Sequence, residues 1–300
     1  MHRFLRAAGF SMYQKKRDIR ALLRCLAKEA GRSKCIQLDR DTTLYEVKTE
    51  VAPGFGIAMY GELNEKEELE IEYYYPYLYN SEITSRAECT VQRHTEKETF
   101  AGLLDEYKVG ISLIFYLINP LEYMERRMTE GDYPAISSTN LSGLAVRGKI
   151  LLPIKKTAMQ IEKAKVAARN RDNLLEAAKN GDEDAMESLT IEDIDLYSQA
   201  SRRAAKEDIY SIVETCFMPS GIECDQYSVV GEILEITSRK NRITGEELYD
   251  MKLECNDLIL RVGINKMDLL GEPLPGRRFK GRIWMLGWAN FAESRRMYMN

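Results

Sequence analysis

The sequence predicts an α+β protein with three parts: a mixed α/β-sheet domain over residues 1–154, a helical segment over 155–222 and a small β-barrel-like domain over 223–300. In the first part, strand-like segments recur between Gly, Pro and Asn residues. In the second, Pro and most Gly disappear while Ala, Lys and Glu accumulate. In the third, short alternating strands bend at glycines, a pattern typical of a curled sheet of the oligonucleotide-binding (OB) type.

The first part begins with an expected strand over 4–10, followed by a helix for which Ser11 is a suitable N-cap. The helix is predicted from apolar side chains at the spacing of one helical face, namely Ile19, Leu22, Leu23 and Leu26. Turn residues then separate four expected strands, over 35–38, 44–51, 56–63 and 69–79.

The same order of elements then restarts, which favours two βαβββ-like units. A strand is expected over 88–93, and further strands over 111–118 and 144–154. Between the first two we expect a helix with one apolar face, formed by Phe100, Leu103, Leu104 and Tyr107. Asn119-Pro120 is expected to end a strand.

The helical segment divides at Lys179-Asn180-Gly181, a typical helix stop, after which Asp182 is suited to cap the next helix. A last helical face is expected over Ile209, Ile212, Val213 and Cys216. From Tyr227 onward the alternation of strands returns, with Asn256-Asp257 as a tight hairpin turn and a final strand over 279–286.

The charge balance, the apolar runs and the cysteine spacing argue against several classes of function. The chain has 43 basic and 47 acidic residues, so no bulk charge draws it to nucleic acid or to an anionic membrane. Residues 1–10 lack a signal-peptide pattern, and the longest apolar run, 111–118, is too short to span a bilayer. We therefore expect a cytoplasmic protein without a membrane partner. Its six cysteines form no CxxC pair, which favours buried, reduced thiols, and no cofactor is predicted.

Three stretches together resemble a known family: MHRFLRAAGFS at 1–11, the segments at 181–197 and 207–227, and GEILEITSRKNRITGEELYDM with LLGEPLPGRRFKGRIWMLGW in the tail. They are similar to a domain-of-unknown-function family of anaerobic Gram-positive, clostridial-type bacteria. The resemblance extends over essentially the whole chain. It implies a bacterial cytoplasmic protein and no activity, cofactor or site residue.

The first candidate site is a single-stranded nucleic-acid groove in the third part. Alternation places four side chains in one row, Arg278, Lys280, Arg282 and Trp284, and cations beside an aromatic ring suit phosphates and stacked bases. A loop between expected barrel strands adds Arg239, Lys240 and Arg242. The alternative is a solvated outer face, because residues 227–300 hold 12 basic and 10 acidic side chains.

The second candidate is a tyrosine row. Strand alternation aligns Tyr73, Tyr75 and Tyr77, with Tyr79 after them. Such a row suits a ligand or a partner peptide, because each ring combines apolar area with a hydroxyl. Ordinary sheet packing explains the same pattern and is favoured.

The third candidate is a divalent metal site of the kind held by the vicinal-oxygen-chelate architecture. Its ligands are expected from His2 and His94, the only histidines, with Glu70 or Glu72 on a later strand. The simpler interpretation is that His2 lies at a chain terminus that frays and that His94 is a surface residue.

The sequence shows no phosphate-binding glycine loop and no nucleophile elbow. The leading hypothesis is therefore a non-enzymatic binding or scaffolding protein, whose partner is unknown and is either another protein or a second copy of the chain. The helical segment from Thr157 is expected either to bridge the flanking domains or to form a dimer contact. Nucleic-acid binding and a metal-dependent enzyme remain the alternatives.

Overall fold

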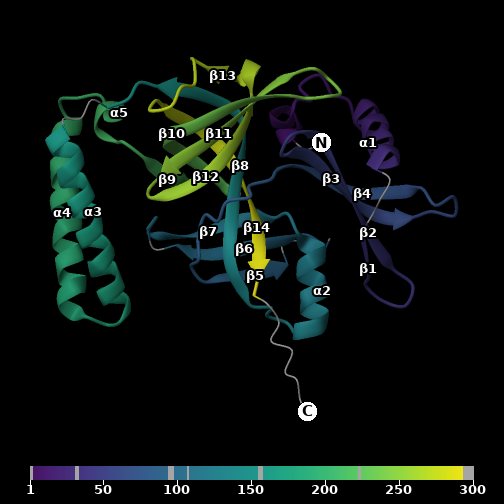
Figure 1. Ribbon diagram of the computed structural model, residues 1–300, viewed down its shortest axis with the longest axis horizontal. Helices are drawn as coiled ribbons and strands as arrows, with labels where there is room; N and C mark the ends of the chain where they lie inside the picture. Colours follow the sequence, from purple (N-terminus) through teal and green to yellow (C-terminus); the bar gives the residue numbers. More distant parts are fainter. Residues whose placement is uncertain are drawn as a thin grey trace, which may run out of the picture. The chain divides into compact units, whose positions relative to one another are not determined.

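The computed structural model describes residues 3–30, 34–93, 98–106, 108–154, 158–221 and 224–292. The chain forms two compact units, one of residues 1–150 with 215–300 and the other of residues 151–214. The larger unit contains two β-sheets, and the smaller unit consists of helices (Figure 1).

The smaller sheet has four antiparallel strands in chain order: β1 (Lys34–Gln37), β2 (Thr43–Ala52), β3 (Phe55–Leu63) and β4 (Leu69–Leu78). All four match the strands expected from the sequence. Helix α1 (Lys16–Ala30) packs on β2 and buries the predicted apolar face of Ile19, Leu22, Leu23 and Leu26. The Thr49 hydroxyl of β2 donates to the Leu26 carbonyl at 3.2 Å, which joins the helix to the sheet.

The larger sheet joins strands from both ends of the chain. From the first half it takes β5 (Cys89–Arg93), β6 (Phe100–Glu106), β7 (Ile111–Leu117) and β8 (Ile136–Leu151). From the second half it takes β9 (Cys216–Pro219), β10 (Gln226–Lys240), β11 (Glu247–Cys255), β12 (Leu258–Asn265), β13 (Leu269–Leu270) and β14 (Arg278–Phe291). The order is β13-β8-β12-β11-β10-β14-β7-β6-β5, with β9 beside β10.

The C-terminal strands do not form a sheet of their own. β12 pairs in parallel with β8, and β14 pairs in parallel with β7. Because β14 also pairs with β8, hydrogen-bonded neighbours lead from β8 through β12, β11, β10 and β14 back to β8. The expected boundary at residues 222–223 therefore does not divide the sheet, since β8 of the first half completes this circuit. The Asn256-Asp257 turn is confirmed, and both residues have the positive φ angles, 50° and 59°, that a tight hairpin requires.

Two expected elements differ in type. Residues 4–10 lie mostly in the 3₁₀-helix η1 (Arg3–Ala8), which buries Phe4 and Leu5. The helix expected around Phe100–Leu104 is strand β6, whose buried positions alternate at every second residue. Leu103 and Leu104 thus lie on opposite faces, and β6 is paired on both sides, with β5 and with β7. Pairing on both sides satisfies the backbone of this segment better than an isolated helix would.

A helix that the sequence analysis missed follows β7. Helix α2 (Pro120–Glu130) begins at the proline that was interpreted as a break, because the first turn of a helix tolerates a residue without an N–H. It buries Leu121, Tyr123 and Met124. With no helix between β5 and β6, and α2 after β7, the order of two βαβββ-like units is wrong.

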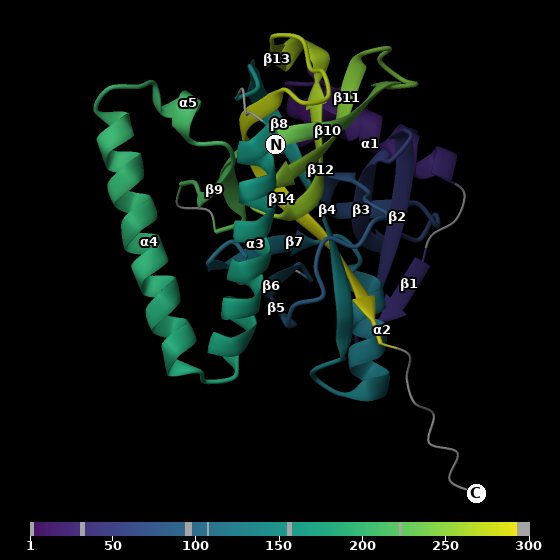
Figure 2. The same ribbon diagram turned by 60° about the vertical axis from the view of Figure 1, so that its left-hand side comes forward.

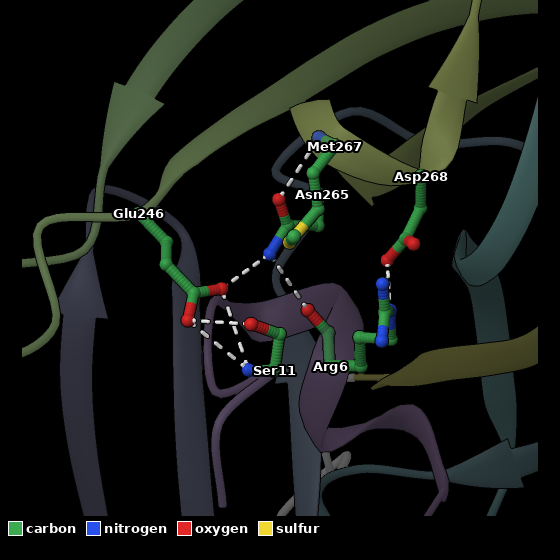
Figure 3. A network of polar contacts seen from close by, with 6 residues as sticks. All are labelled: Arg6, Ser11, Glu246, Asn265, Met267 and Asp268. Atoms are coloured by element: carbon green, nitrogen blue, oxygen red, sulfur yellow. Dashed lines mark hydrogen bonds and ion pairs between the residues drawn. The ribbon is translucent and has the colours of Figure 1, made fainter.

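The N-terminal segment is held by polar contacts with Glu246 just before β11, with Asn265 of β12 and with Asp268 of the 3₁₀-helix η2 (Lys266–Asp268) (Figure 3). Ser11, expected to cap α1, instead donates its hydroxyl to a Glu246 carboxylate oxygen at 2.8 Å and its backbone N–H to the same carboxylate at 3.2 Å. Asn265 donates to Glu246 and to the Arg6 carbonyl, and Arg6 pairs with Asp268. These contacts connect residues at opposite ends of the chain.

The smaller unit is a helical hairpin of α3 (Ala158–Lys179) and α4 (Glu183–Ala204), followed by the short α5 (Ile209–Ile212). Asp182 caps α4 as predicted, accepting from the Ala185 N–H at 3.1 Å. The predicted helical face through Cys216 ends earlier, because Cys216 begins strand β9. None of the helices in the described ranges is long and apolar enough to cross a membrane.

Candidate functional site

The tyrosine row of β4 lies between the two sheets of the larger unit. Tyr75 is 1% exposed, and its ring centroid lies 4.7 Å from that of Tyr116 on β7 and 6.4 Å from that of Trp284 on β14. Tyr73 stacks on Tyr60 of β3 at 4.7 Å. These two predicted ligand residues therefore pack within the fold, and only the end of the row reaches a cavity.

That cavity, which we call the Lys48 pocket, has a volume of about 340 Å³. Its lining comes from β2, the β2–β3 turn, the end of β4, the residue after β7, and β14: Lys48, Glu50, Gly54, Tyr77, Tyr79, Ile118 and Trp288. Tyr79 meets Trp288 edge-on, with ring centroids 5.4 Å apart. Three aromatic rings and a few polar groups are typical of a small-molecule site.

Two close approaches shape the pocket. Gly56 pairs with Tyr77 across β3 and β4, and a Cβ at Gly56 would lie 2.4 Å from the Tyr77 ring. The glycine therefore lets the ring lie flat against the sheet. At the rim, Glu50 accepts the Gly54 N–H at 2.9 Å, which holds the turn between β2 and β3.

Lys48 supplies the charged group of the pocket. Its Nζ donates to the Ile118 carbonyl at 2.8 Å and lies 3.0 Å from a Glu46 carboxylate oxygen and 5.4 Å from the Trp288 ring centroid. Burial lowers the pKa of Lys48, an effect that the Glu46 carboxylate opposes. The third N–H of this ammonium meets no hydrogen-bond acceptor in the part of the chain that the structure describes, so it is available to a ligand.

A chain of hydrogen bonds leads from the Lys48 partner Glu46 to two buried tyrosines. The Tyr60 hydroxyl donates to the Glu46 carboxylate at 2.8 Å, and the Tyr60 and Tyr75 hydroxyls lie 2.8 Å apart. Because Tyr60 gives its proton to Glu46, Tyr75 is the donor to Tyr60. Burial raises the pKa of Tyr60 and of Tyr75 well above the usual value, so both remain neutral donors at neutral pH.

Tyr77 offers a second polar group. Burial raises the pKa of Tyr77, so its hydroxyl is protonated at neutral pH. Within the described ranges this hydroxyl makes no hydrogen bond to the protein, so it can both donate and accept. The Lys48 pocket therefore offers a ligand two polar groups, the Lys48 ammonium and the Tyr77 hydroxyl, among aromatic rings.

The sequence analysis found Tyr77 but missed Lys48, Glu46, Tyr60 and Trp288. One signal was present in β2, where Glu46, Lys48 and Glu50 alternate with Val47, Thr49 and Val51. Charged side chains at every second position of a strand that is apolar on its other face indicate a polar site as well as a solvated face. Trp288 could not be connected with them, because its contact with β2 depends on the packing of the two sheets.

The predicted nucleic-acid residues lie in different environments. Trp284 is 4% exposed, stacks on Phe4 at 5.4 Å and donates its Nε1–H to Asp225 at 2.7 Å. Its ring therefore has no open face for a base. Along β14, Arg278 is buried, Lys280 is half-buried and Arg282 is exposed.

The second group of predicted cations lies at the other end of β10. Arg242 makes a two-pronged contact with Glu29, at 2.6 and 3.1 Å, while Arg239 is half-buried and Lys240 is exposed. In the antiparallel register of β14 and β10, Arg278 lies opposite Glu232, which is seven residues before Arg239, a span of about 20 Å along a strand. The structure thus does not bring the two groups together.

For the predicted metal site, His2 and His94 lie outside the described residues. Glu70 and Glu72 are exposed on β4. They line an open groove of about 1020 Å³ between α1 and β4, where the basic side chains of α1 face acidic ones. Lys28 and Glu68 already pair across this groove at 2.8 Å. No group of three metal-ligating side chains occurs in the ranges that the structure describes.

Residues 5–287 match the family described as "Domain of unknown function, E. rectale Gene description (DUF3881)". The chain belongs to the DUF3881 family. The resemblance of the sequence to a clostridial-type family is thereby confirmed. No curated protein and no solved structure matches this DUF3881 chain.

Proposed function

We propose that this DUF3881 protein is a binding protein that holds a small planar aromatic molecule in the Lys48 pocket. The observation that carries the proposal is the Lys48 ammonium, which lies beside Trp288 with one N–H not used by the described protein. An aromatic ligand would lie between the rings of Tyr77, Tyr79 and Trp288. An oxygen on the ligand would accept from Lys48 Nζ.

Charge around the pocket indicates the kind of acceptor. The Lys48 ammonium is neutralised by Glu46, and Glu50 adds a further carboxylate at the rim. A second anion in this place would be repelled, whereas a neutral carbonyl oxygen would accept the hydrogen bond without that cost. The ligand class is therefore a neutral aromatic ring that carries a carbonyl group, such as an aromatic amide.

The alternatives have less support. A single-stranded nucleic-acid role would need the Trp284 ring, which is buried, together with two groups of cations that lie apart, one on β14 and one at the far end of β10. A metal-dependent role would depend on His2 and His94, which lie outside the described residues. A binding or scaffolding role needs neither.

The test is a titration of the protein with benzamide and with benzoate, followed by tryptophan fluorescence and by ligand-observed NMR. We expect saturable binding of benzamide, at least tenfold tighter than that of benzoate. Lys48→Met should weaken benzamide binding at least tenfold, and Glu50→Gln should bring benzoate closer to benzamide. Lys240→Met, which changes an exposed lysine away from the pocket, is the matched control. Absence of saturable benzamide binding, or equal affinities in Lys48→Met and wild type, would overturn the proposal.

A further inference from the structure

The described side chains of the helical hairpin in the smaller unit form almost no buried core. α3 and α4 run side by side and are joined by a short turn (Figure 2). Among their described side chains, Ala185 alone is buried. Two helices with so little buried apolar surface gain little stability from their mutual contact, because helix stability in proteins comes mainly from the burial of an apolar face.

α4 also carries large apolar side chains that face solvent. Met186 is 45% exposed, Ile191 54%, Ile194 60% and Tyr197 77%. At about 100° per residue, these four positions fall within about 140° of the helix circumference, so they form one face. Glu192 and Asp193, which pair with Arg171 of α3, lie outside this arc. Asp193 falls about 20° beyond the Met186 end of the arc, so the face begins beside the contact with α3 and extends away from it.

The two helices differ in charge. α3 has five basic and three acidic residues, a net charge of +2, whereas α4 has two basic and six acidic residues, a net charge of −4. Within the hairpin this complementarity is already used, because Arg171 of α3 lies 2.8 Å from Asp193 of α4. An adjacent side of each helix can form the same kind of contact with a helix of opposite charge from another chain.

We infer that the apolar face of α4 is covered by α3 of a second copy of the chain. Two hairpins related by a two-fold axis along the helices form a four-helix bundle in which every α3 has two α4 neighbours, one from each copy. All neighbouring helices are then antiparallel and opposite in charge, and helices of like charge lie diagonally apart. A contact between two α4 helices would instead bring two acidic helices together. The arrangement is independent of the Lys48 pocket and of its proposed ligand.

The experiment measures the mass of the full-length protein by light scattering and by sedimentation, as a function of concentration. The wild type is expected to be dimeric at micromolar concentration. Ile194→Asp and Tyr197→Asp should each raise the dissociation constant at least tenfold, because each places a carboxylate in the apolar contact. Higher salt should weaken the dimer as well, since it screens the attraction between α3 and α4.

Tyr133→Asp is the matched control, because Tyr133 is also a highly exposed tyrosine, at 89%, but lies in the larger unit. It should leave the dimer unchanged. Circular dichroism tests whether each variant keeps its helices. A wild type that is monomeric at 100 μM, or a dimer that Tyr133→Asp and Tyr197→Asp weaken equally, would overturn the inference.

Discussion

The ammonium of Lys48 lies 5.4 Å from the centroid of the Trp288 ring, so a strand of the smaller sheet and the last strand of the larger sheet meet at one cation–π contact. The contact places a positive group against an aromatic face, where it is attracted by the ring quadrupole. Trp288 also contacts the ring of Tyr79, and both residues line the Lys48 pocket.

The ion pair beneath this contact should show in stability measurements. Lys48→Met leaves the buried Glu46 carboxylate without its cation, so we expect the free energy of unfolding to fall by about 2–3 kcal/mol at neutral pH. Adding Glu46→Gln removes the unpaired charge and should recover about half of this loss. Chemical denaturation of the two single variants and the double variant measures the coupling; strictly additive losses would contradict the pairing.

The buried tyrosines should make the protein sensitive to alkali. Burial raises the pKa of Tyr60 and Tyr75 in the fold, whereas in the unfolded chain they titrate near 10. Above that pH the unfolded state releases protons that the folded state retains, so stability is present below pH 10 and is lost as pH rises beyond it. Each such tyrosine contributes a slope of about 1.4 kcal/mol per pH unit.

Tyr75→Phe removes one of these groups and the hydroxyl that donates to Tyr60. We expect the unfolding free energy of this variant to fall less steeply between pH 10 and 11, by the slope that corresponds to one titrating group. The measurement is denaturant unfolding at several alkaline pH values, with Tyr133→Phe, an exposed tyrosine, as the control. An identical slope in Tyr75→Phe and wild type would show that Tyr75 ionises normally in the fold.

The cysteines should divide into reactive and protected groups. Cys25, Cys35 and Cys224 are exposed, so the expectation of buried cysteines is wrong for these three. Burial raises the pKa of Cys89 and of Cys255 to about 12. The Cys255 thiol also donates towards the Cys216 and Val230 carbonyls, at 3.1 and 3.2 Å. Because the thiolate is the reactive species, native alkylation with iodoacetamide at pH 8 should modify the exposed group and leave Cys89 and Cys255 intact.

Peptide mass spectrometry after the alkylation gives the result for each site, and the same treatment in denaturant should modify all six cysteines. Modification of Cys255 in the native protein at the rate found for Cys25 would place that thiol at the surface and contradict the described packing of β11.

The anchor of the N-terminal segment predicts unequal effects for two adjacent glutamates. Glu246→Ala removes the acceptor for the Ser11 hydroxyl and N–H and for Asn265 (Figure 3), so we expect a loss of about 2–3 kcal/mol in unfolding free energy. Glu247→Ala removes a surface pair with Lys266 and should leave the unfolding midpoint unchanged. Equal unfolding midpoints for the two variants would refute the role of Glu246 as an anchor.

Local patterns in the sequence predicted much of the secondary structure. The apolar face of α1, the four strands of the smaller sheet, the cap of α4 and the Asn256-Asp257 hairpin depend on residues close together in the chain. The secondary-structure predictions failed where a short apolar segment fits both the helical and the strand periodicity. Phe100–Leu104 satisfies a helical and an alternating pattern, and its two strand partners decided between them.

The sequence by itself determined which segments alternate, which form amphipathic helices, and that Tyr77 belongs to an aromatic row. Only the tertiary structure decided that β12 and β14 join β8 and β7, that Tyr75 and Trp284 are packing residues, and that Lys48 meets Trp288. The physical reason is distance along the chain. Periodicity reports which face of an element is apolar, but the choice of partner for that face depends on the packing of all elements together, which no local pattern records.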